Sequence, residues 1–193
     1  HEKWEKKPVT DWYRRTLLRD HILRSNVTLN DFMNMQPMFD QGDLTIEAYD
    51  HRIEQDANQA TIRLTRIGHD WSKGEGSKLQ VSKALVFPFD SATLTASYTL
   101  RNLSKQALAL RLAPESTLIP PVAFEYLPSV DELPNYAITA NGRSSNLNFS
   151  LLEATTLEAA DTVLLSDRIN HLNVQVGWNK ATESWLLPLK AMA

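Results

Sequence analysis

The chain has 193 residues, 42% of them hydrophobic, and its 20 basic and 23 acidic residues give a formal net charge of −3. This composition excludes general disorder, and the lack of a basic excess argues against a nucleic-acid partner. Cysteine is absent and no apolar run is long enough to span a bilayer, so we expect no disulfide and no membrane partner, and a cytoplasmic location.

The first predicted elements are helical and fall within residues 1–40. Thr28 and Asp31 form a capping-box pattern, which predicts a short helix after residue 28. A longer helix is predicted before it, because apolar and aromatic side chains recur there at helical spacing. The residues that form this stripe are Tyr13, Leu17, Leu18, His21 and Ile22.

From Leu44 onward the hydrophobic period becomes two residues, which predicts short β-strands. The clearest strand covers residues 93–100, where apolar side chains share one face and Thr or Ser the other. Further stretches alternate in the same way: 62–64, 79–87, 108–112, 147–151, 163–165, 172–178 and 185–189. Turn-forming residues separate them at 68–77, 88–90, 102–104, 141–142 and 177–179.

Half-polar strands at this spacing predict a mainly β fold. They favour two packed antiparallel sheets over a parallel, helix-covered sheet, whose strands would be apolar on both faces. Asn141-Gly142 is the best hairpin signal, and the proline-bearing stretch 120–135 is predicted to be a long loop. We therefore predict a β-sandwich over residues 41–193, preceded by the helical segment 1–40.

Signatures of metal or cofactor chemistry are weak in this sequence. The five histidines never fall at a metal-binding spacing beside a carboxylate, and no phosphate-cradling glycine loop is present. Asp40, Asp43, Glu47 and Asp50 crowd one region without EF-hand spacing. A solvated acidic loop is the favoured interpretation over a calcium site, so we expect neither a metal nor a cofactor.

Two charged residues lie in or beside apolar strands. Lys83 is in phase with Leu79 and Val81, so its ammonium turns toward the apolar side and needs a partner. Glu115 follows the run 108–112 at a strand end. We expect Lys83 to pair with Glu115 or with an aspartate, the alternative being that it extends past the sheet margin to solvent.

Two tryptophans lie at turns, where exposed indole rings can stack on sugar rings. Trp71 lies in a glycine-bearing loop and Trp178 directly follows a glycine. Packing inside the protein is the alternative role for both.

Six motifs follow one another along the chain. Arg15, Asp20 and His21 fit an R-x-x-x-x-D-H pattern, and Gly42-Asp43-Leu44 is followed by Tyr49. The remaining motifs are Ile62–Gly68, Leu79–Lys83, Tyr98–Asn102 and Arg111–Ser116. Together, from about residue 13 to 193, they resemble the C-terminal domain of glycoside hydrolase family 57 enzymes, the alpha-amylase/4-alpha-glucanotransferase group. Pro114, Ser116 and Thr117 depart from the family pattern around Glu115.

The resemblance implies a galactose-mutarotase-like supersandwich that packs beside an N-terminal catalytic barrel of the same parent protein. Because that family's catalytic carboxylates belong to the barrel, we expect no catalytic residue here and a chain that is a piece of a longer one. Residues expected to contact alpha-glucan are Trp71, Trp178, Tyr49, Arg66 and Glu115. Residues expected at the interface with the barrel are Arg14, Arg15, Asp20 and His21.

Two other functions stay open. A free-standing mutarotase-like or lyase-like enzyme would use Glu115 with His21 or His171 as acid and base. An autonomous carbohydrate-binding module would depend on Trp71 or Trp178 for glucan affinity.

Overall fold

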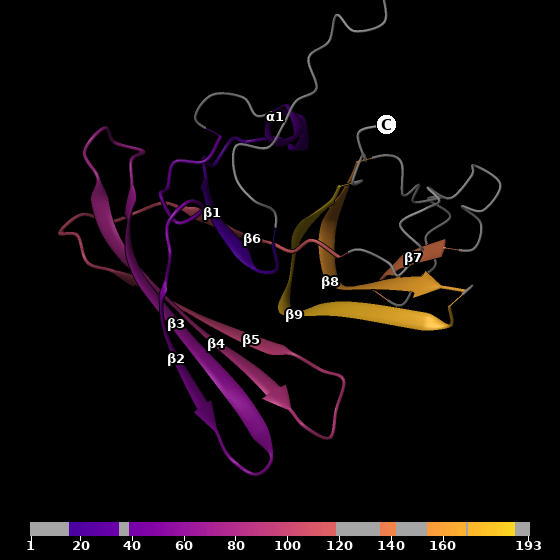
Figure 1. Ribbon diagram of the computed structural model, residues 1–193. Coiled ribbons are helices and arrows are strands. Elements are labelled where there is room, and N and C mark those ends of the chain that lie inside the picture. The colour runs from indigo at the N-terminus through magenta and orange to yellow at the C-terminus, as the bar shows by residue number, and fades with distance from the viewer. Residues whose placement is uncertain (1–15, 35–38, 119–135, 142–153, 169, 188–193) are drawn as a thin grey trace, which may run out of the picture. The chain divides into compact units, whose positions relative to one another are not determined.

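The computed structural model describes residues 16–34, 39–118, 136–141, 154–168 and 170–187 (Figure 1). These residues belong to two compact units, one with β1–β6 and α1, the other with β7–β9. The predicted mainly β, antiparallel class is confirmed, although the strands form three sheets where two were expected. The predicted division at residue 40 stays a prediction. No helix in the described ranges has the length and apolar character needed to cross a membrane.

The first unit is built on a four-stranded sheet. Its strands are β2 (Asp50–Gln55), β3 (Gln59–Asp70), β4 (Ser77–Pro88) and β5 (Thr95–Asn102). Each pairs antiparallel with the strand that follows it in the chain, in the order β2-β3-β4-β5 (Figure 1). The predicted strands at 62–64, 79–87 and 93–100 are therefore confirmed.

A second sheet of two strands completes this unit. β1 (Arg19–Leu23) pairs antiparallel with β6 (Arg111–Glu115), so that Arg19 lies opposite Glu115. Ile22 of β1 shares a buried core with Leu79 and Val81 of β4 and with Leu44. Burial of these side chains joins the two-stranded sheet to the four-stranded one.

The predicted N-terminal helix is wrong where the structure can test it. Residues 19–23 form β1, and residues 1–15 lie outside the described ranges. Residues 20–23 are all buried, so both faces of the strand are covered and no two-residue period is visible in the sequence. Within the part of the chain that the structure describes, α1 (Leu29–Met33) is the only helix, with the predicted capping box between Thr28 and Asp31.

The second unit is a three-stranded sheet in the order β7-β8-β9. It comprises β7 (Tyr136–Ala140), β8 (Thr155–Asp167) and β9 (Leu172–Leu186) around a core of Leu157, Ala160 and Val163. The stretches 120–135 and 147–151, predicted as a loop and a strand, lie outside the described residues.

One predicted turn in this unit is wrong, and another does not close the expected hairpin. Residues 177–179 lie inside the continuous strand β9, whose register against β8 shifts between Ala160 and Thr162. The strand therefore continues through a β-bulge at the place where the glycine indicated a turn. Asn141 has a positive φ of 53° but closes no two-residue hairpin, because Ala140 pairs with Val163.

Replacing Ile22 by Ala should lower the free energy of unfolding by about 2–5 kcal/mol, because the side chain is fully buried at 0% exposure. The matched control is Ile53→Ala, where the side chain is 63% exposed and a change within about 0.5 kcal/mol is expected. Urea unfolding followed by circular dichroism measures both. Equal losses for the two variants would contradict the assigned core.

Candidate functional site

The most unusual feature of the first unit is the charge buried on β1. Asp20 and His21 are adjacent and almost fully buried. Because neighbouring side chains of a strand point to opposite faces, the two need separate sets of partners. The structure supplies both sets from segments distant in the chain.

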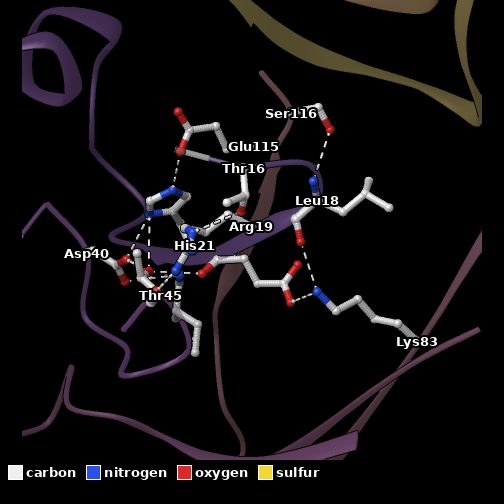
Figure 2. Close-up of polar contacts among 11 residues, drawn as sticks. Thr16, Leu18, Arg19, His21, Asp40, Thr45, Lys83, Glu115 and Ser116 are labelled. Carbon is white, nitrogen blue, oxygen red and sulfur yellow. Dashed lines mark hydrogen bonds and ion pairs between the residues drawn. The ribbon is translucent and has the colours of Figure 1, made fainter. Parts of the chain in front are cut away.

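Asp20 is paired with Lys83 of β4. The Lys83 Nζ lies 2.6 Å from Asp20 Oδ2 and donates a second hydrogen bond of 2.9 Å to the carbonyl of Leu18 (Figure 2). The hydroxyl of Tyr49 donates to the same carboxylate oxygen, and the ammonium lies 4.4 Å from the centroid of the Tyr49 ring. The expected pairing of Lys83 with an aspartate is confirmed.

Two tyrosines remain neutral beside this pair. Burial, followed by the negative charge of Asp20, raises the pKa of Tyr49 and of Tyr98 well above the ordinary value. Tyr49 therefore acts as a hydrogen-bond donor to the carboxylate throughout the physiological pH range.

His21 lies between two carboxylates. Its Nδ1 is 2.8 Å from Asp40 Oδ2, and its Nε2 is 3.0 Å from Glu115 Oε2 (Figure 2). Phe32 of α1 and Phe39 lie against the imidazole, with ring centroids 5.4 and 6.2 Å away. A neutral imidazole can donate only one hydrogen bond, so two carboxylates favour the doubly protonated cation.

The protonation of His21 follows from this geometry. Burial lowers its pKa, but the hydrogen bonds and charges of Asp40 and Glu115 outweigh burial and raise the pKa above 6.5. The direction of this shift and the two carboxylate contacts both favour the imidazolium in the folded state.

Asp40 corrects the expectation of a solvated acidic loop. Its carboxylate is buried and accepts hydrogen bonds from the backbone of Ile22 and Gly42, at 3.1 and 2.9 Å. Thr45 Oγ1 donates to it as well, at 2.6 Å. The partners of Asp40 come from β1 and from the loop that follows Asp40. Its carboxylate is therefore held inside the fold and does not face solvent.

The expected barrel-interface residues remain a prediction. Arg14 and Arg15 lie outside the described residues. Asp20 and His21 make their contacts inside the first unit, as described above.

The expected glucan-contact residues divide into partly buried and exposed ones. Tyr49 and Glu115 are partly buried and bound to Asp20 and His21 respectively. Trp71 and Trp178 expose 44% and 36% of their surface, in the first and second unit respectively. The glucan-contact role of all of them stays a prediction.

Arg66 and Trp71 are linked through two residues that the sequence did not single out together. Asp43 Oδ2 lies 3.9 Å from Arg66 Nη2 and 2.8 Å from His69 Nδ1. The His69 ring in turn lies 5.5 Å from that of Trp71. The sequence signal for this arrangement was the position of His69 on β3, two residues after Ile67, because residues two apart in a strand share a face.

No group of three or more His, Asp or Glu side chains in the described ranges is arranged to hold a metal ion. The contacts described above are ion pairs and hydrogen bonds. Most of these bonds are internal to the fold.

Comparisons with known proteins agree with this architecture. Residues 1–193 match the protein family described as "Alpha-amylase/4-alpha-glucanotransferase, C-terminal". The crystal structure of 4-alpha-glucanotransferase from Thermococcus litoralis is similar, with a TM-score of 0.62 and 18% sequence identity. The match covers 91% of this chain and 22% of that one, so the chain spans about a fifth of its length. No curated protein matches the sequence.

Replacing Lys83 by Met should destabilise the protein by about 3–5 kcal/mol, because Asp20 would stay buried without its cation. The matched control is Arg63→Met, which removes an exposed pair with Glu54 and should cost about 0–1 kcal/mol. Chemical denaturation of the three proteins measures the difference. A loss below 1 kcal/mol for Lys83→Met would show that Asp20 does not depend on this cation.

The free energy of unfolding should depend on pH through His21. Because its pKa is raised on folding, its contribution is complete below the unfolded pKa of about 6.5 and is lost as pH rises through the folded pKa. The advantage of wild type over His21→Gln should therefore shrink as the pH is raised above about 6.5, measured by urea unfolding.

His51→Gln provides the control for this experiment, because His51 lies exposed on β2. It should keep the wild-type pH dependence. A constant difference between wild type and His21→Gln across the range would contradict the protonated state of His21.

Proposed function

Because the chain belongs to the family of C-terminal domains of alpha-amylases and 4-alpha-glucanotransferases, we propose that it is an accessory, non-catalytic domain of an alpha-glucan-acting enzyme. In this proposal it supports an N-terminal catalytic barrel of the same parent chain and also contacts the glucan. The share of the Thermococcus litoralis chain that it matches, 22%, agrees with one domain of a larger protein. The lack of cysteine agrees with a cytoplasmic location.

The observation that carries the non-catalytic assignment is the engagement of the buried carboxylates. Retaining glycosidases need two carboxyl groups about 5 Å apart with the sugar between them. Here the space between Asp40 and Glu115 is taken by the imidazole of His21. The carboxylate of Asp20 is bound by Lys83 and Tyr49. These groups would have to leave the core before they could act on a glycosidic bond.

The alternative of a free-standing acid–base enzyme has one supporting observation, the 3.0 Å contact between His21 Nε2 and Glu115 Oε2. A general acid or base must reach the substrate proton, however. His21 is 0% exposed and has both nitrogens bound to carboxylates. The contact therefore supports a structural pair better than a catalytic one.

The chain alone should release no reducing ends from amylose and should transfer no glucosyl units between maltooligosaccharides. Its buried carboxylates are held by internal partners, so none is placed for bond cleavage. A reducing-sugar assay and chromatography of the products measure this. Joined to the catalytic domain of its parent enzyme, the same chain should be part of an active protein.

The matched control is Glu115→Gln, which separates a contaminating activity from one that belongs to the chain. Turnover that persists unchanged in this variant would come from a contaminant. Sustained turnover that is lost in Glu115→Gln would contradict the non-catalytic assignment.

A further inference from the structure

A half-exposed tryptophan lies beside a histidine at the end of β3. The Trp71 and His69 ring centroids are 5.5 Å apart, and their planes meet at 37°. The Trp71 surface is 44% exposed, and the His69 side chain is also accessible to solvent. An apolar ring and a polar ring thus stand side by side at the surface.

The loop that carries Trp71 is held in place. Its backbone N–H donates to the Gln41 carbonyl at 2.9 Å, and the buried Asp70 accepts from the backbone and hydroxyl of Ser72 at 3.0 and 2.8 Å. A Cβ at Gly76 would lie 2.9 Å from Trp71 Cη2, so the glycine lets the indole lie close to the chain just before β4. The ring is preorganised, which lowers the entropic cost of binding a ligand.

His69 is oriented by Asp43. The carboxylate accepts from the His69 backbone N–H through Oδ1 and contacts Nδ1 through Oδ2, both at 2.8 Å. A Cβ on Gly68 would lie 2.6 Å from Asp43 Oδ1, so this close approach also requires glycine. In the neutral tautomer that donates Nδ1–H to this carboxylate, Nε2 is the ring nitrogen that can accept a hydrogen bond from a ligand.

The charged side chains next to His69 are engaged with one another. Asp43 pairs with His69 and lies 3.9 Å from Arg66 Nη2, and Arg66 Nη1 lies 3.9 Å from Glu47. Ile67, exposed on the same face of β3 as His69, extends the apolar area. Such a surface suits an uncharged ligand that has an apolar face and hydroxyl groups at its edge.

We propose that Trp71 and His69 form a contact site for one glucosyl unit of an α-1,4-glucan. The C–H face of the sugar stacks on the indole, and one of its hydroxyls donates to His69 Nε2. The ligand class rests on the proposed function, whereas the site rests on the geometry of the two rings. Tyr49 and Glu115 have no part in this contact, because their side chains are bound in the core.

Titration of the chain with maltoheptaose tests this site by calorimetry. Trp71→Ala should raise the Kd at least tenfold, since it removes the stacking surface. His69→Phe keeps a ring beside Trp71 but removes the acceptor, and should raise the Kd about 2–10-fold, the effect of one hydrogen bond. The matched control is Phe89→Ala, which removes another exposed aromatic ring from the first unit and should leave the Kd within twofold.

A second measurement covers the case in which Trp71→Ala disturbs the fold. The chain has five tryptophans, so its NMR spectrum has five indole N–H signals. Maltoheptaose should shift the signal that is missing in Trp71→Ala more than the other four, and cellohexaose should shift it less.

The outcomes separate this inference from the proposed function. Binding that is unchanged in Trp71→Ala, or weakened as much in Phe89→Ala, overturns the site and leaves an accessory glucan-contacting domain in place. The site is also overturned if no binding is detected at about 10 mM maltoheptaose. This concentration is about a hundredfold above a Kd of 0.1 mM. Turnover by the chain contradicts the proposed function alone.

Discussion

The first unit depends on the burial of two charged side chains in consecutive positions of one strand. A lone buried charge costs several kcal/mol, and adjacent residues of a strand cannot share one partner. Asp20 therefore draws Lys83 from the four-stranded sheet and Tyr49 from just before β2, while His21 draws Asp40 and Glu115 from the opposite side. These requirements fix β1 between the sheet and α1. The apolar core of Ile22, Leu79 and Val81 then closes around it.

This constraint explains why sequence reasoning succeeded for some elements and failed for others. β3, β4 and β5 were predictable because one face of each is apolar and the other polar, so the two-residue period is visible. β1 is buried on both faces, and its residues happened to continue a helical spacing from Tyr13. The strand character became evident only through pairing with β6, about 90 residues further along the chain.

The contacts of the buried site were also only partly predictable from the sequence. Lys83 lies in phase with apolar residues, which was enough to require an acidic partner, but its identity depended on topology. Glu115 is 94 residues from His21 in sequence, and no local pattern could indicate their contact. Asp40 was assigned to solvent because its sequence neighbours are acidic, whereas its neighbours in space are backbone N–H groups of Ile22 and Gly42.

A domain whose ionisable groups are used to hold its own interior has only its surface to offer a substrate or a partner. This agrees with an accessory role beside a catalytic domain, and it directs attention from the buried carboxylates to exposed rings such as Trp71. Because of the same network, the fold requires each of these buried charges to keep its partner. The family match and the geometry therefore lead to one account, in which ion pairs here maintain structure and do not perform catalysis.

The most direct test of this account is the coupling energy between Asp20 and Lys83. It is measured by a double-mutant cycle of Asp20→Asn, Lys83→Met and the double variant in urea unfolding. The account predicts a coupling of about 2 kcal/mol or more, with the double variant more stable than Lys83→Met alone. Additive losses, with a coupling within about 0.5 kcal/mol of zero, would contradict the claim that this buried pair holds β1 in place.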